Sequence, residues 1–355
     1  MKQLSKKEEY KIVRKKGRLI MIALLLGCTC TFHPVAKAAV QNIEVQAIRN
    51  QADSSTDTTV LSKKRVITAA SGISKDSSGR MYLADRSYHV LRIREKNGDY
   101  SVLAGQEGKS GYQDGNASKA LFNQPWDVVS YKKGWAVSDT ENHVIRYYNG
   151  KTVKTISGTG TKGYKNATGT KAKFNRPTGL AVGKDGELYV ADTGNHVIRK
   201  IDPNGKVTVY AGSKSGCGEG TLKKALFCEP TGLYYYKGAL YVADSGNHRI
   251  CKIADGKVTT VAGSSKGVEG DCAGSANKAR FSNPQDMILY KNDLYISDTG
   301  NGSVKKLSQG KVTTVVEAFS LEGKNTPAEP CGIMIKNGYL FVGDLFAEKL
   351  IKIKL

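Results

Sequence analysis

Two aspartates are the first candidates for chemistry, because each follows a proline by two residues, in Pro125-Trp126-Asp127 and Pro284-Gln285-Asp286. Two carboxylates beside an indole and an amide could hold a divalent cation, or a cationic or hydroxylated ligand. The alternative is that each carboxylate bonds an adjacent loop and has only a structural role. No catalytic residue is predicted, because acid–base or nucleophilic chemistry would need a third group. Asp127 and Asp286 are therefore candidate metal ligands, and no other cofactor is expected.

These aspartates belong to a segment that recurs six times. Each copy contains a strand-like run that ends in an aspartate, at Asp85, Asp139, Asp192, Asp244, Asp298 and Asp344. By subtraction these aspartates are 54, 53, 52, 54 and 46 residues apart. A proline (Ala70 in the first copy), a short apolar run and a tight turn precede the aspartate, and two further strand-like runs follow it. Turns such as Asn204-Gly205 predict hairpins, so each copy is expected to be a four-stranded antiparallel sheet.

Sheets with two apolar faces must stack, and four-stranded repeats of about 50 residues close radially. The sequence therefore predicts an all-β, six-bladed β-propeller over residues 58–355. Only one strand-like run, residues 349–355, follows Asp344, so an N-terminal strand must complete the last blade. Residues 43–48, within the 39–57 linker, and residues 59–68 both alternate suitably. Copies two and five face each other in such a ring, so Asp127 and Asp286 should approach the channel from opposite sides.

Three of the repeated runs resemble the NHL repeat: Asp139-Thr140-Glu141-Asn142-His143, Asp192-Thr193-Gly194-Asn195-His196 and Asp244-Ser245-Gly246-Asn247-His248. The resemblance covers about residues 66–355 and implies a six-bladed propeller of a bacterial exported type. Copies five and six depart from it, with Gly302 and Phe346 among the differing residues. Propellers of this type include lyases, lactonases, protein scaffolds and RNA binders, so the resemblance implies a fold more than an activity.

The repeated polar residues are predicted to be structural. Histidine occupies one equivalent position in four copies, at His89, His143, His196 and His248. Residues on four different blades lie too far apart to share a metal, so we interpret each as a turn residue held by backbone hydrogen bonds. The repeated aspartate is interpreted as a turn cap that bonds backbone N–H groups two or three residues later. Metal lyases that resemble this chain place histidine ligands around the channel. In this sequence no histidine directly follows the opening prolines.

The long connections between copies have an unusual composition. They span residues 105–124, 158–176, 212–229 and 263–283, and each ends in an Ala-x-Phe run predicted to plug between blades. These connections bring many lysines and two tyrosines to one face. The candidate ligand-binding residues are Lys109, Tyr112, Lys162 and Tyr164, with Trp126, Asp127, Gln285 and Asp286 at the channel. Basic side chains beside aromatic rings suit anionic sugars or polymers, and the alternative is a merely solvated surface.

Five cysteines follow residue 38, at Cys217, Cys228, Cys251, Cys272 and Cys331. Their spacings match no zinc motif. Cys217 takes the place of Tyr112 and Tyr164, and Cys228 replaces an asparagine within the same connection, so these two are predicted to form a disulfide. The pairing of the other three stays open.

The first 38 residues predict export. A basic stretch precedes an apolar run over residues 19–32, and Ala36-Lys37-Ala38 matches a signal-peptidase site. About a dozen apolar residues are too few for a permanent membrane span. Cys28 lies in a lipobox-like context, so a lipid anchor at the cell surface is an alternative. Residues 1–38 hold nine Lys/Arg and two Asp/Glu, so removing them leaves +15 of the formal charge of +22.

Two functions compete on these observations. The favoured one is a secreted or extracytoplasmic, monomeric binding module for an anionic envelope polymer, glycan or protein, acting through its loop-rich basic face. Nucleic acid is not an expected partner, because export removes the protein from it. The alternative is a metal-dependent lyase or lactonase-like hydrolase at the channel mouth, where a divalent cation would be the cofactor.

Overall fold

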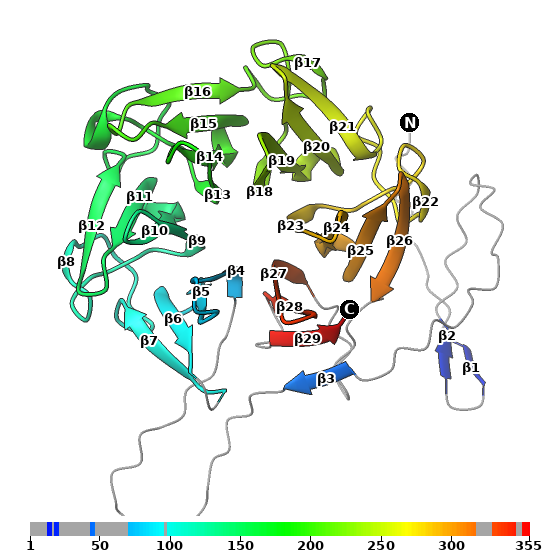
Figure 1. Cartoon of the computed structure of the whole chain (residues 1–355), viewed down its shortest axis with the longest axis horizontal. Coiled ribbons are helices and arrows are strands. Elements are labelled where there is room, and N and C mark those ends of the chain that lie inside the picture. Colours follow the sequence, from blue (N-terminus) through cyan, green and yellow to red (C-terminus); the bar gives the residue numbers. More distant parts are fainter. Residues whose placement is uncertain are drawn as a thin grey trace, which may run out of the picture. The chain divides into compact units, whose positions relative to one another are not determined.

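A computed structural model describes residues 13–15, 18–20, 43–46, 70–95, 98–316, 329–345 and 350–355. The chain divides into two compact units, Met1–Gln41 and Asn42–Leu355. In the first, β1 (Val13–Lys15) pairs with β2 (Arg18–Ile20). The second is a ring of six antiparallel sheets, which Figure 1 shows along its axis. No helix within the described residues is long and apolar enough to cross a membrane.

The first three blades follow one another along the chain. Blade 1 comprises β4 (Ala70–Lys75), β5 (Met81–Asp85), β6 (Val90–Arg94) and β7 (Tyr100–Ala104). Blade 2 comprises β9 (Pro125–Tyr131), β10 (Gly134–Asp139), β11 (Val144–Tyr148) and β12 (Thr152–Ser157), with the short β8 (Gly115–Asn116) at its edge. Blade 3 comprises β13 (Pro177–Val182), β14 (Leu188–Asp192), β15 (Val197–Ile201) and β16 (Val207–Ala211).

The remaining blades complete the ring. Blade 4 comprises β18 (Pro230–Tyr236), β19 (Ala239–Asp244), β20 (Arg249–Ala254) and β21 (Lys257–Gly263), edged by β17 (Gly220–Thr221). Blade 5 comprises β23 (Pro284–Tyr290), β24 (Asp293–Asp298), β25 (Ser303–Ser308) and β26 (Lys311–Val316), edged by β22 (Gly274–Ser275). Blade 6 comprises β27 (Pro330–Lys336), β28 (Tyr339–Asp344), β29 (Leu350–Lys354) and β3 (Ile43–Gln46).

Short 3-10 turns and one left-handed residue connect the second and third strands of blades 2 to 5. These turns are η1 (Thr140–Asn142), η3 (Thr193–Asn195), η4 (Ser245–Asn247) and η5 (Thr299–Asn301), and η2 (Gly169–Lys171) lies in the connection before blade 3. The residue after each of the four turns has a positive φ, such as 57° at His143 and 60° at Gly302.

The second strand of each blade is buried along almost its whole length because a neighbouring blade covers each of its faces. β14, for example, is Leu-Tyr-Val-Ala-Asp, and every one of its residues is buried. Such a strand reads as a continuous apolar run instead of an alternating one. The outer strand β12 mixes buried and exposed residues, as expected of a strand at the rim.

The N-terminal strand closes the ring as predicted. β3 pairs antiparallel with β29, with Val45 opposite Ile351. Of the two candidate segments, the closing one is therefore 43–46, and 59–68 lies outside the described residues. The short strands β8, β17 and β22 cover the outer edges of their blades, which protects those edges from unwanted pairing.

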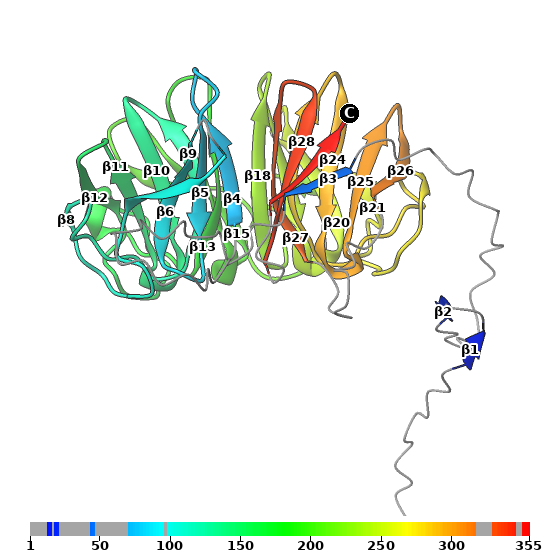
Figure 2. The same cartoon turned by 90° about the horizontal axis from the view of Figure 1, so that it is seen from below.

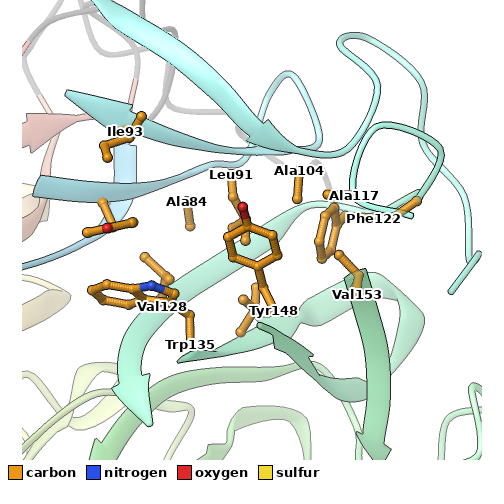
Figure 3. Close-up of a cluster of buried hydrophobic side chains, with 13 residues drawn as sticks. Ala84, Leu91, Ile93, Ala104, Ala117, Phe122, Val128, Trp135, Tyr148 and Val153 are labelled. Carbon is orange, nitrogen blue, oxygen red and sulfur yellow. The ribbon is translucent and has the colours of Figure 1, made fainter. Parts of the chain in front are cut away.

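The hydrophobic core lies between adjacent blades. Figure 3 shows the cluster between blades 1 and 2, in which Tyr82 and Trp135 stack with ring centroids 3.7 Å apart. Phe122, from the connection, is fully buried in the same cluster. The equivalent Phe174, Phe227 and Phe281 are also fully buried, so the predicted plugs are confirmed. Burying each such ring is worth roughly 1.5–3 kcal/mol.

The two faces of the propeller differ in their connections, as the side view in Figure 2 helps to follow. Pro125 pairs with Asp139 at one end of β9, and Tyr131 pairs with Gly134 at the other end. The connections between blades therefore begin and end on the face that carries the 3-10 turns, here the loop face. The turns joining the first two strands of each blade lie on the opposite face, here the hairpin face.

Candidate functional site

A belt of polar contacts surrounds the channel where the first strands begin. In four blades the residue after the opening position is small and donates to a backbone carbonyl of the next blade. The donors are Ser71 Oγ to Trp126 O at 2.7 Å, Thr178 Oγ1 to Thr231 O at 3.4 Å, Thr231 Oγ1 to Gln285 O at 3.0 Å and Cys331 Sγ to Ser71 O at 3.4 Å. Blades 2 and 5 carry the larger Trp126 and Gln285 at this position, so a different group must link each of these blades to the next one.

Asp127 and Asp286 make that link. Asp127 Oδ2 accepts the Leu180 N–H of blade 3 at 2.9 Å, and Asp286 Oδ2 accepts the Ile333 N–H of blade 6 at 3.0 Å. The Oδ1 atoms accept the N–H of the following residue in their own strand, at 2.7 and 2.8 Å. Each carboxylate therefore joins two blades, and its partner is a strand of the next blade instead of the adjacent loop considered from the sequence.

The two carboxylates also share the channel. Both side chains are partly exposed although most of their neighbours are buried. Burial in the narrow ring raises the pKa of Asp127 from 3.8 to about 6, against the opposing effect of the Leu180 and Val128 N–H groups. Burial first, and then the charge of Asp127, raise the pKa of Asp286 well above its usual value. The charge of Asp127 thus acts on the Asp286 carboxylate of the opposite blade.

A second substitution accompanies each aspartate, and sequence reasoning missed it. The residue before the repeated aspartate is Ser138 in blade 2 and Ser297 in blade 5, but alanine or glycine in the other four blades. Ser138 Oγ accepts the Asp127 N–H at 2.9 Å, and Ser297 Oγ lies 3.2 Å from Asp286 O. The paired change in the same two copies was a readable signal that these positions are in contact.

Trp126 and Gln285 lie at the loop-face end of this belt, and both are buried. The Arg86 guanidinium lies 4.8 Å from the Trp126 ring centroid and donates to Gln124 Oε1 at 2.9 and 3.0 Å. Gln285 Nε2 donates to Asn283 Oδ1 at 2.9 Å, and its Oε1 is buried with no partner in the described part of the chain. The four predicted channel residues thus occupy one belt, on blades 2 and 5.

The donor set does not fit a metal centre of the lactonase or lyase kind. Within the described residues no three His, Cys, Asp or Glu side chains come together as a group that could hold a metal ion. Each oxygen of Asp127 and Asp286 already accepts a backbone N–H. We therefore derive no metal-assisted step at this position.

The repeated aspartate anchors a buried cation, which differs from its predicted turn-capping role. Asp85 does accept the Tyr88 N–H, three residues later, at 3.3 Å. In blades 2 to 5, however, Oδ1 accepts a backbone N–H 16 or 17 residues earlier, such as that of Asn123 at 2.7 Å from Asp139. Oδ2 pairs with a buried cation on the third strand, for example Arg199 Nη1 with Asp192 at 2.7 Å.

These buried cations explain where Tyr112 and Tyr164 lie. The Arg146 guanidinium is 5.2 Å from the Tyr112 ring centroid and 5.1 Å from that of Phe122. Arg199 lies in the same way between Tyr164 and Phe174, at 5.2 Å from each. Both tyrosines cap an arginine with one side of the ring, and yet they remain 46 and 54% exposed on the loop face. Their outer sides are therefore open to a ligand.

Charge on the loop face is concentrated in one connection. Residues 158–176 include five basic residues, Lys162, Lys165, Lys171, Lys173 and Arg176, and no Asp or Glu. The four lysines form no ion pair within the described residues, whereas Arg176 pairs with Glu141. In the preceding connection Lys109 Nζ donates to Gln106 Oε1, and Asp114 is engaged by Arg146. The predicted basic face thus has its strongest charge between blades 2 and 3.

The predicted Cys217–Cys228 disulfide is not formed in the structure, where both thiols are free. Cys217 Sγ donates to Ser265 O at 3.2 Å, whereas Cys228 Sγ lies 3.9 Å from Ser215 Oγ. Cys251 replaces the repeated arginine of its blade and is buried, and Arg249, two residues earlier, supplies the cation that pairs with Asp244. The change at Cys251 is thus compensated within the blade.

The four histidines connect blades, as their predicted structural role requires. Nδ1 of each accepts a backbone N–H from the next blade's connection at 3.0–3.1 Å; the donors are Gln124, Arg176, Glu229 and Asn283. Burial lowers the pKa of His89 and His143, which favours the neutral ring that can accept this bond. The histidines therefore belong to the architecture.

This arrangement defines a six-bladed β-propeller whose blades are joined around the channel by hydroxyl, thiol and carboxylate contacts. The chain carries NHL repeats: the model of the NHL repeat matches residues 174–201 and 227–253, and a relative named for the same repeat is similar to it. It is 28% identical over 323 residues to NHL repeat-containing protein 2 of Gallus gallus, covering 77% of this chain and 44% of that protein. It is 30% identical over 273 residues to protein SUPPRESSOR OF QUENCHING 1, chloroplastic, of Arabidopsis thaliana, covering 70% of this chain and 26% of that protein. The chain thus spans less than half the length of these relatives.

Solved structures share the fold at low identity. An auxiliary nutrient binding protein from Bacteroides thetaiotaomicron has a TM-score of 0.58 and 16% identity, covering 81% of this chain and 69% of that one. A gluconolactonase from Xanthomonas campestris has a TM-score of 0.56 and 14% identity, covering 82 and 87%. A streptogramin B lyase has a TM-score of 0.53 and 13% identity, covering 83 and 95%. Binding proteins and enzymes therefore share this architecture.

Proposed function

We propose that this protein is a binding module that recognises an anionic polymer of the cell envelope through its loop face. The observation that carries the proposal is the connection 158–176, with five basic residues, no acidic one and the half-exposed Tyr164. Lysines beside an open aromatic ring suit a chain of sugars or phosphodiesters that carries negative charge. The binding function named for the Bacteroides propeller supports a ligand-binding role in general terms.

The same proposal places the protein outside the cytoplasm. The basic stretch, apolar run and Ala36-Lys37-Ala38 motif support export, and Cys28 is the alternative site of a lipid anchor. The cleavage motif and Cys28 lie outside the described residues. An exported basic domain meets anionic envelope polymers at once, whereas nucleic acid is not within its reach.

The test compares binding of Lys162→Asn/Lys165→Asn/Lys173→Asn and of the unchanged protein to soluble dextran sulfate, using uncharged dextran as the reference. We expect salt-sensitive binding to dextran sulfate only, and an affinity loss of at least tenfold in the variant. The matched control is Lys132→Asn/Lys237→Asn/Lys291→Asn, which removes the same charge from the hairpin face. Equal losses in both variants would mean that net charge alone attracts the polymer, and the proposal would then be wrong.

The enzymatic alternative is a metal-dependent lyase or hydrolase at the channel, favoured by the shared fold of the lyase and the gluconolactonase. Its decisive measurement is the metal content of the purified protein beside an Asp127→Ala/Asp286→Ala variant. Stoichiometric metal that disappears in the variant would favour the enzyme. The contacts of both carboxylates with backbone N–H groups lead us to expect no such metal.

A further inference from the structure

The hairpin face carries a regular arrangement that the loops do not explain. In blades 2, 4 and 5 the first strand ends in tyrosine and the next residue is lysine, in Tyr131-Lys132, Tyr236-Lys237 and Tyr290-Lys291. The lysine Nζ atoms lie 5.3, 5.2 and 5.2 Å from the centroids of the preceding tyrosine rings. All three lysines are exposed. Three blades thus present the same cation–aromatic pair at equivalent places.

Blade 6 adds a pair of the same kind from a different pair of strands. Lys352 of β29 lies 4.3 Å from the ring centroid of Tyr339 on β28. The C-terminal Leu355 N–H donates to Gly338 O in the adjacent turn at 2.9 Å, which places this pair on the hairpin face as well. The pairs are therefore distributed around the ring.

The backbone gives no reason for lysine in these turns. Lys132, Lys237 and Lys291 have φ values of 51, 46 and 49°, in the left-handed region. That region favours glycine and asparagine, and a lysine there is strained. Blade 6 has Asn337 at the corresponding position, with a φ of 52°. Since folding alone would be better served by asparagine, the recurrent lysine points to a role at the surface.

Several acidic residues on this face are used by their own turns, although Asp255 in the turn between β20 and β21 is exposed. Asp76 pairs with Arg80 at 2.7 Å, and Asp202 accepts the N–H groups of Asn204 and Lys206 at 2.9 and 2.8 Å. Glu187 accepts the Tyr189 hydroxyl at 3.1 Å. The lysines of the three pairs form no ion pair within the described residues. The hairpin face therefore presents positive charge that the protein does not neutralise itself.

We propose that the hairpin face docks on an anionic phospholipid surface. The lysine–tyrosine pairs come from blades 2, 4, 5 and 6, so only a broad surface would contact all of them together. A lysine reaching the headgroups above a tyrosine ring is the combination found where proteins meet the membrane interface. The loop face, with its proposed polymer site, would then point away from the membrane. This inference does not depend on that site.

The experiment measures binding of the full chain to vesicles by co-sedimentation. One vesicle type contains phosphatidylglycerol and phosphatidylcholine, and the other contains phosphatidylcholine alone. The test variant is Lys132→Asn/Lys237→Asn/Lys291→Asn, and the control is Lys162→Asn/Lys165→Asn/Lys173→Asn on the loop face. Both variants lose equal charge and keep the same N-terminal segment, so any binding by that segment is common to them.

We expect the hairpin-face variant to bind phosphatidylglycerol vesicles about a hundredfold more weakly than the control. Because asparagine suits the left-handed turns, the melting temperature of the hairpin-face variant should equal or exceed that of the unchanged protein. Weaker binding by this variant would therefore not reflect misfolding. Equal binding by the two variants would overturn the inference, as would equal binding to both vesicle types. Dextran sulfate binding is a separate readout, so failure of one proposal is distinguishable from failure of the other.

Discussion

At the residue scale, the channel carboxylates are structural links that keep a titratable charge inside the ring. Asp127 and Asp286 each join their own blade to the next through backbone N–H groups. Small residues elsewhere in the belt permit this close approach: a Cβ on Gly72 would lie 2.5 Å from Asp127 Oδ1. The belt is therefore a set of matched residues in which each size and charge depends on its neighbour.

The raised pKa of Asp127 predicts how stability depends on pH. Its pKa is about 6 in the folded protein and 3.8 in the unfolded reference, so the folded state holds the proton more tightly. The stabilising contribution is complete below about pH 4 and is lost as the pH rises through 6. The loss amounts to at most about 3 kcal/mol. Denaturant unfolding from pH 4 to 8 should therefore show the unchanged protein losing stability relative to Asp127→Asn/Asp286→Asn as the pH rises. Parallel curves would contradict this.

The sequence predicted the channel pair better than it predicted the pair's surroundings. Opposite copies of a six-membered ring place Asp127 and Asp286 correctly, because spacing fixes the blade to which each belongs. Their partners Leu180 and Ile333 depend on how closely neighbouring strands approach, which one copy cannot show. The sequence showed that Tyr112 and Tyr164 lie in lysine-rich connections. The arginine that packs against each ring is apparent only from the structure, which places the third strand beside the connection.

At the scale of elements, a buried cation attaches each long connection to its blade; it is an arginine in three of them and Lys305 in the fourth. Arg199 pairs with Asp192 and also donates to Lys165 O, Lys173 O and Asn166 Oδ1 of the connection 158–176. One guanidinium thus holds the segment that carries the proposed polymer site. The propeller positions its most basic loop through an ion pair with no exposed side-chain surface.

We expect Arg199→Met to destabilise the protein by about 3–5 kcal/mol, because it leaves the buried Asp192 carboxylate without its cation. The connection 158–176 should then become sensitive to limited proteolysis. The control is Lys184→Met, which breaks the exposed Lys184–Asp185 pair at 3.9 Å and should change the free energy of unfolding by less than about 1 kcal/mol. Equal effects of the two substitutions would show that Arg199 does not anchor the connection.

At the scale of the whole molecule, charge is distributed in two different ways. On the loop face the positive charge is concentrated in one connection, whose lysine-rich composition is visible in the sequence. The hairpin face spreads it, one lysine at a time, over equivalent turns of several blades. Such a pattern does not form a cluster in the sequence, since Lys132, Lys237 and Lys291 are 105 and 54 residues apart by subtraction. It becomes a surface only when the ring closes.

Ring closure itself leads to the last prediction. β3 supplies the outer strand of blade 6 through register pairs from Ile43–Ile353 to Gln46–Leu350. A chain of residues 47–355 should therefore melt several degrees below one of residues 42–355, because four cross-strand pairs are lost and β29 becomes an open edge. A synthetic peptide of residues 42–48, added to the shorter chain, should restore part of the difference, as measured by thermal unfolding. Identical melting temperatures would show that the ring is held closed without this strand, and that the contacts around the channel alone maintain its circular order.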